Sequence, residues 1–92
     1  MSYNWEEFQA AYQSAPSHVK EWIDSDACYN LCNRVEEDQG LNSNVHQNLM
    51  QTISRYYLGV IPENQLAIKL VTECGIDEGT ALKVSIQIKE II

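Results

Sequence analysis

The chain has 92 residues, of which 45% are hydrophobic, and a formal net charge of −7, a composition that predicts one globular domain and disfavours disorder. An acidic chain is repelled by phosphate backbones, so direct nucleic-acid binding is not expected. No stretch approaches the ~20 apolar residues that a membrane span needs, and the first residues do not read as a secretory signal. We therefore expect a cytoplasmic protein with reduced thiols.

The first predicted helix spans residues 2–14. It is defined by aromatic residues at helical spacing, namely Trp5, Phe8 and Tyr12. The helix ends before Pro16, because the residue that precedes a proline avoids the helical region. We expect this helix either to dock on a main bundle formed by residues 17–92 or to act as an arm that contacts a neighbouring chain.

Five further helices are predicted after Pro16. In chain order they are expected at 17–24, at 26–39, at 43–58, from Pro62 onward, and after an N-cap at Asp77. Three glycines follow apolar segments of helical period and precede an aliphatic residue, which is typical of a left-handed C-terminal cap: Gly40, Gly59 and Gly75. No segment alternates with a period of two. The expected fold is therefore all-α, a compact bundle of five to six short helices.

A weak internal repeat with an offset of 35 residues relates the third and fourth predicted helices to the fifth and sixth. The matching pairs are Leu31 with Leu66, Val35 with Leu70, Gly40 with Gly75, Leu49 with Val84, and Ile53 with Ile88. Each unit would be an αα-hairpin, so the bundle would hold two hairpins after its N-terminal helices. The repeat has two alternative explanations, namely a duplication and a chance agreement of two helical periodicities.

From Ser17 to the C-terminus the chain resembles a pattern of caps and core positions. The residues that carry it are Leu31, Val35, Gly40-Leu41, Leu49, Ile53, "LGVIPENQL" at 58–66, "CGIDEGTAL" at 74–82, and Ile88, Ile91 and Ile92. This pattern is similar to short helical domains in uncharacterised proteins of reduced-genome, candidate-phylum bacteria. The resemblance implies an all-helical fold and lends no catalytic residue. "YYLG" at 56–59 departs from the expected aliphatic run and suggests an aromatic contact surface.

Cys28 and Cys32 lie four residues apart and share one predicted helix face with Leu31 and Val35, so we expect them to pack in the core. A metal site or a thiol-redox pair that also uses Cys74 is the alternative. The spacing is not that of a C-x-x-C motif, and no further ligand lies at a typical distance along the chain. We therefore expect no metal, no cofactor and no catalytic residue.

Apolar residues outside the core stripes are the predicted contact residues. Leu82 and Ile86 form a second edge on the last helix, and Ile68 is out of register on the fifth. Either the N-terminal helices cover these side chains or a partner does. The predicted contact residues are Trp5, Phe8 and Tyr12, followed by Tyr56, Tyr57, Leu82 and Ile86.

These patterns predict a non-enzymatic acidic protein that works through protein–protein contact, by self-assembly or as an adaptor. A second hypothesis follows from the charge distribution: residues 1–38 carry eight acids and two bases, whereas residues 39–92 carry five acids and four bases. Such a protein could inhibit a nucleic-acid-binding protein by occupying its basic surface. The third hypothesis is the metal or thiol-redox protein that uses Cys28, Cys32 and Cys74.

Overall fold

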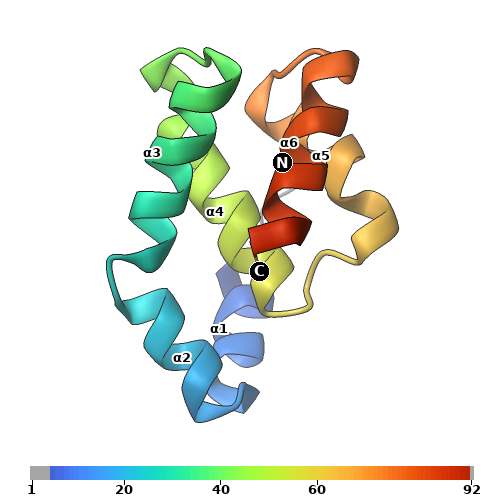
Figure 1. Cartoon of the computed structure of the whole chain (residues 1–92). Coiled ribbons are helices and arrows are strands. Elements are labelled where there is room, and N and C mark those ends of the chain that lie inside the picture. Colours follow the sequence, from blue (N-terminus) through green and yellow to red (C-terminus); the bar gives the residue numbers. More distant parts are fainter. Residues whose placement is uncertain (1–4, 92) are drawn as a thin grey trace.

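The computed structural model describes residues 5–91, with side chains for residues 5–90. Its six α-helices are α1 (Trp5–Ser14), α2 (Ser17–Asp24), α3 (Ala27–Gln39), α4 (His46–Tyr57), α5 (Leu66–Cys74) and α6 (Glu78–Ile91) (Figure 1). Residues 5–91 contain no strand, which confirms the predicted all-α fold. Residues 2–4 of the first predicted helix, and the side chains of the last two isoleucines, lie outside this described part.

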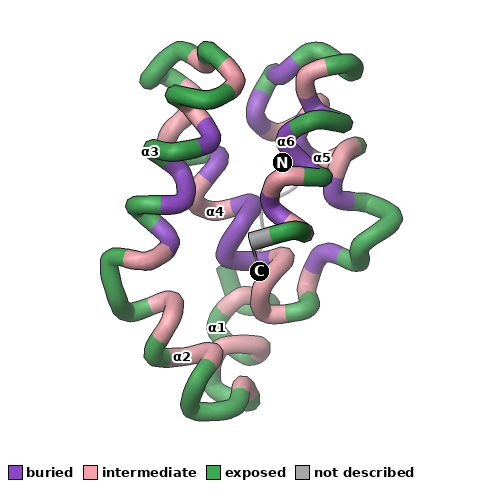
Figure 2. The backbone as a smooth tube through the Cα atoms, viewed as in Figure 1, coloured by how far each residue is buried: buried purple, intermediate pink, exposed green. Residues whose placement is uncertain are grey.

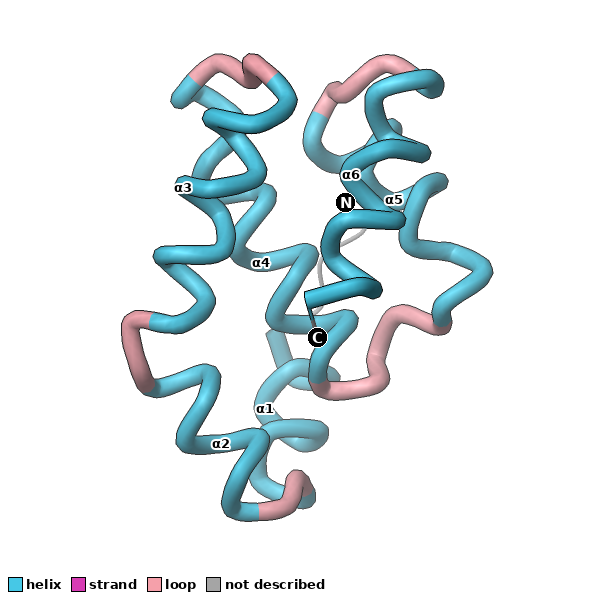
Figure 3. Tube along the Cα trace, in the orientation of Figure 1, coloured by secondary structure: helices cyan, strands magenta, loops and turns pink. Residues whose placement is uncertain are grey.

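Helices α3 to α6 form two αα-hairpins, as predicted. Helix α3 packs on α4, and α5 packs on α6; α4 also packs on α5, and α3 on α6, which closes a four-helix core. The α3–α4 and α5–α6 loops lie at the same end of the molecule (Figure 3). Helix α2 contacts α3, and α1 and α2 together occupy the opposite end (Figure 1).

The core is formed by the inner stripes of these four helices. Its fully enclosed side chains are Cys32, Val35, Leu49, Ile53, Leu66, Leu70, Ala81, Val84 and Ile88. Most belong to the pairs that the 35-residue offset relates, so the two hairpins contribute equivalent positions to one core. In contrast, α1 and α2 contain no buried residue (Figure 2). Duplication as the origin of the repeat stays a prediction.

The predicted glycine caps are confirmed. Gly40 and Gly75 end α3 and α5 with φ of 63° and 71°, in the left-handed region that side chains other than glycine rarely adopt. The following Leu41 donates its backbone N–H to the Glu36 carbonyl over 2.8 Å, which closes the last turn. The predicted N-cap is also present, because the Asp77 carboxylate accepts the Thr80 N–H over 3.1 Å.

The fourth and fifth helices begin later than predicted. Pro62 has an extended ψ of 155° and precedes a 3₁₀ turn at Glu63–Gln65, so it is not the first residue of the fifth helix. The buried Ile61 side chain anchors the chain just before this turn. A similar 3₁₀ turn at Ser43–Val45 leads into α4. Both α-helices therefore begin one tight turn after the position that the sequence indicates.

Replacing Gly75 by alanine tests the cap. Gly75→Ala places a side chain at a positive φ, and we expect it to lower the free energy of unfolding by about 1 kcal/mol. Gly79→Ala is the matched control: Gly79 lies in α6, and an added Cβ would meet only the Asp77 carboxylate at 3.5 Å. This control should be neutral or stabilise by up to about 1 kcal/mol. Urea unfolding measures both; equal effects would contradict the cap assignment.

Candidate functional site

Three large aliphatic side chains project from α5 and α6 into solvent. Ile68, Leu82 and Ile86 are exposed to 55%, 57% and 55%. An open, mainly apolar groove between the two helices is lined by Ala67, Ile68, Val71, Thr72, Glu78 and Leu82. We call this groove, together with the Ile86 side chain one helical turn beyond Leu82, the α5–α6 face.

The hairpin itself forces these side chains outward. Helix α6 buries Ala81, Val84 and Ile88 against the other core helices. Ser85 is also buried, and its hydroxyl donates to the Leu82 carbonyl over 2.8 Å, so it needs no partner from another helix. With this stripe enclosed, the side of α6 that carries Leu82 and Ile86 faces solvent.

One of the two explanations given for these apolar residues is wrong. The N-terminal helices do not cover Leu82 and Ile86, which remain more than half exposed. Helices α1 and α2 lie at the end of the molecule away from the α5–α6 loop (Figure 1). Within the described chain, the aliphatic surface of α6 is therefore left without a covering helix.

The aromatic side chains of α1 differ in their surroundings. The Trp5 ring is 56% exposed and stacks on Phe8, with ring centroids 5.6 Å apart. Phe8 is half-buried and borders a groove that also includes Tyr29 and Met50. The Tyr12 hydroxyl donates to Asp24 of α2, and this hydrogen bond raises the pKa of Tyr12. Phe8 and Tyr12 thus face other parts of the chain, whereas Trp5 faces solvent.

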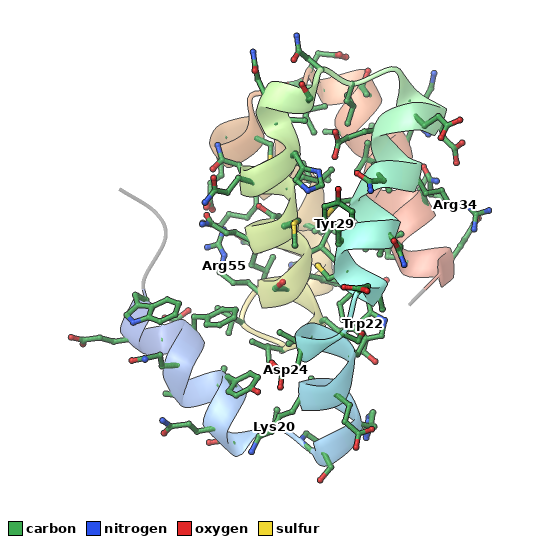
Figure 4. The ribbon with its side chains drawn as sticks, turned by 90° about the vertical axis from the view of Figure 1, so that its left-hand side faces the viewer. Lys20, Trp22, Asp24, Tyr29, Arg34 and Arg55 are labelled. Carbon is green, nitrogen blue, oxygen red and sulfur yellow. The ribbon has the colours of Figure 1, made fainter. Side chains whose placement is uncertain are left out.

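Tyr56 and Tyr57 are half-buried at the end of α4. The Tyr57 ring stacks on Trp22 of α2, with ring centroids 4.3 Å apart. Trp22 lies where α2 meets the main bundle, so this stack helps to attach α2 (Figure 4). Tyr56 packs against the core, and burial together with the nearby Glu63 carboxylate raises its pKa. Both rings border a shallow groove with His18 and Pro62.

A buried ion pair joins the two hairpins, and sequence reasoning did not find it. The guanidinium of Arg55 on α4 binds the Glu73 carboxylate on α5, with side chains only 4% and 10% exposed. Lys69, one turn before Glu73, approaches the same carboxylate at 3.5 Å. The available signal was Arg55 itself, a charged residue placed between core positions Ile53 and Tyr56 on an otherwise amphipathic helix.

The three thiols are buried, as expected for core residues. The Cys28 sulfur lies 3.5 Å from the Ser54 hydroxyl, and the Cys74 sulfur lies 3.5 Å from the Thr52 hydroxyl. Within the part of the chain that has side chains described, no three His, Cys, Asp or Glu residues come together as a possible metal site. Asn30 and Asn33 on the same helix are exposed, and so is Tyr29 (Figure 4).

The thiol environment perturbs all three pKa values. A hydrogen bond to Cys32 lowers the pKa of Cys28 to about 7, with Ser54 adding to the effect. The same bond, with burial, raises the pKa of Cys32. Burial also raises the pKa of Cys74, against a smaller opposing effect of Thr52. The folded protein therefore keeps Cys32 and Cys74 protonated at pH values where an unfolded chain ionises them.

The two histidines differ in their surroundings, and His46 lies near enough to the Cys28 thiol to contribute to its lowered pKa. His46, the first residue of α4, pairs with the Glu36 carboxylate, and Tyr29 meets its ring edge-on with centroids 5.2 Å apart. His18 is exposed near the start of α2.

None of the helices in residues 5–91 combines the length and apolar composition that a membrane crossing requires.

The two tryptophans should differ in their effect on stability. Trp22→Ala removes the stack on Tyr57 and its packing on the core, and we expect it to lower the free energy of unfolding by about 2 kcal/mol. Trp5→Ala removes a side chain that is 56% exposed and should change it by less than about 0.5 kcal/mol. Urea titration followed by circular dichroism measures both; equal losses would contradict the different packing of the two rings.

Stability should fall at alkaline pH because of Cys32 and Cys74. Above about pH 8.5 the unfolded chain loses these protons more readily than the folded chain, so each thiol lowers the free energy of unfolding by up to about 1.4 kcal/mol per pH unit. Cys28 acts in the opposite direction, and only between about pH 7 and 8.5, where the folded form alone is ionised. Urea unfolding of reduced protein between pH 9 and 10 measures the slope.

Cys74→Ala is the control for this slope. The variant should make the decline less steep, because one of the two thiols with a raised pKa is gone. The slopes are compared rather than the absolute stabilities, since the substitution also loses core packing. An unchanged slope in the variant would contradict the assignment of Cys74.

No protein-family model, curated protein or solved structure matches this chain. The resemblance to short helical domains of reduced-genome bacteria stays a prediction, and the function proposed below depends on burial, contacts and charge within the chain itself.

Proposed function

We propose that this protein is a non-enzymatic, cytoplasmic helical protein that acts by binding another protein chain through the α5–α6 face. One observation carries the proposal: three large aliphatic side chains are each more than half exposed on two adjacent helices, and two of them, Ile68 and Leu82, line a groove between these helices. Single exposed aliphatic residues are ordinary on protein surfaces. A group of three beside an apolar groove is typical of a binding surface.

The composition of the α5–α6 face fits a protein contact. Its lining is mainly aliphatic, and Glu78 contributes a charged side chain to it. Interfaces between proteins commonly combine an apolar centre, which loses its water on binding, with a polar rim that remains hydrated. Burying apolar surface contributes about 25 cal/mol per Å², so several aliphatic side chains supply the attraction while the rim sets orientation.

The second and third hypotheses gain less from the structure. Acids that a nucleic-acid mimic would present are partly engaged within the chain: Glu36 pairs with His46, and Asp38 accepts from Gln87 over 2.7 Å and lies 3.8 Å from Arg34. The thiols of Cys28, Cys32 and Cys74 are enclosed by the core. Neither arrangement supports these functions as directly as the exposed aliphatic side chains support a contact.

Photo-crosslinking tests the proposal. A benzophenone amino acid at position 82 should crosslink another protein chain in an extract of the cells that make the protein. The matched control places it at position 29, because Tyr29 is similarly exposed, at 50%, on α3. Excess unmodified chain should compete with the product, whereas chain carrying Leu82→Gln should not. The crosslinked product should still form at 0.5 M salt, because salt screens charged interactions and has little effect on an apolar contact.

Two outcomes would overturn the proposal. Equal products from positions 82 and 29 would mean that the α5–α6 face is not a specific surface. A product that disappears as salt rises would instead favour binding by charge, as the acidic-inhibitor hypothesis requires.

A further inference from the structure

One side of α6 carries charged and aliphatic residues in a definite order. Glu78, Leu82, Ile86 and Lys89 follow one another at spacings of four, four and three residues, which places them on one side of the helix. An acid therefore stands at the N-terminal end of this stripe and a base at its C-terminal end, with the two exposed aliphatic side chains between them. We call these four residues the α6 stripe.

The α6 stripe is complementary to itself when a second helix runs in the opposite direction. Antiparallel pairing about a two-fold axis between Leu82 and Ile86 sets each Leu82 beside Ile86 of the second copy. The same operation places Glu78 level with Glu90 of the second copy and one residue from Lys89, which shares the side of the helix that carries Leu82 and Ile86, at both ends. Parallel pairing would instead bring like charges together. The helix dipoles also favour the antiparallel arrangement, because each N-terminus then lies near the other C-terminus.

We propose that the partner of the α5–α6 face is a second copy of this chain, which packs its α6 antiparallel to α6 about this two-fold axis. The inference rests on the proposed function, since it names the partner of the same surface. A two-fold contact needs a patch that matches itself, and the α6 stripe meets this requirement in both shape and charge.

The charge distribution also favours a second copy at this surface. The chain has a net charge of −7, but α5 and α6 carry three bases and three acids: Lys69, Lys83 and Lys89 against Glu73, Glu78 and Glu90. Helices α1 to α3 each carry more acids than bases, and of these α3 packs on α6 through its apolar inner stripe. Two copies that meet through α6 therefore approach through neutral helices, which reduces the repulsion between two chains of like charge.

Lys89 is available for this pairing. Its ammonium lies 3.8 Å from the Glu63 carboxylate, with the two side chains 33% and 73% exposed, and an ion pair with one partner so open to solvent contributes little to stability. In the dimer, Lys89 binds Glu78 of the second copy in place of its own Glu63. Each Lys89 therefore still forms one ion pair.

Solution mass of the purified, reduced chain tests the inference. Sedimentation equilibrium across micromolar to millimolar concentrations should show a dimer that dissociates on dilution. Leu82→Gln should weaken the dimer at least tenfold, and Tyr29→Gln, at a similarly exposed position on α3, should leave it unchanged. Urea unfolding should show that both variants remain folded, because neither replaces a buried side chain.

Charge reversal tests the direction of the helices. Glu78→Lys or Lys89→Glu alone sets like charges together at two places and should weaken the dimer by about tenfold. The double variant Glu78→Lys/Lys89→Glu restores opposite charges and should return to within about threefold of the original dissociation constant. Failure of the double variant to recover, with the fold intact by urea unfolding, would overturn the antiparallel arrangement.

The inference and the proposed function fail in different ways. A chain that stays monomeric at millimolar concentration, or a dimer that survives Leu82→Gln, would overturn the second copy as partner. If position 82 still crosslinks a different protein in the cell extract, the proposed function stands without it. Loss of both the dimer and the position-specific crosslink would overturn both.

Discussion

The fold depends on mutual burial of aliphatic stripes between two hairpins, because none of its helices is long enough to be stable alone. The α-helices contain between 8 and 14 residues, near or below the length at which an isolated helix is marginal in water. Each inner stripe therefore needs the others. Leu49 and Ile53 of one hairpin and Leu70 and Ile88 of the other are fully enclosed. This requirement determines which side of α5 and α6 is hidden, and so which side is left for a partner.

Much of this architecture could be predicted from local patterns. A glycine at a helix end has few other uses than the left-handed cap, so Gly40 and Gly75 marked helix ends reliably. Helical spacing identified the inner stripes, including the thiols of Cys28 and Cys32, because three or four residues separate neighbours on one side of a helix. It also distinguished Leu82 and Ile86 from the buried residues of α6. These are properties of one helix at a time.

The features that escaped prediction depend on how the helices cross. The Trp22–Tyr57 stack and the Arg55–Glu73 ion pair join side chains from different helices, and no spacing along the chain indicates that they meet. The position of α1 escaped for the same reason, since its aromatic stripe fits several surfaces equally well. The first residues of α4 and α5 could not be predicted correctly, because a 3₁₀ turn and the first turn of an α-helix favour similar residues.

The absence of buried residues in α1 divides the molecule into two levels of stability. The amide protons of Trp5–Ser14 can exchange with solvent through a local opening that leaves the four-helix core in place. Amide protons near Ile53 or Val84 exchange only when the core itself unfolds, because their surroundings are completely enclosed. In thermodynamic terms the chain behaves as two cooperative units of unequal stability. Helix α2 also lacks a buried residue, but Trp22 attaches it to the core, so the boundary between the two units lies near Pro16, and protease cleavage there would leave the two hairpins folded.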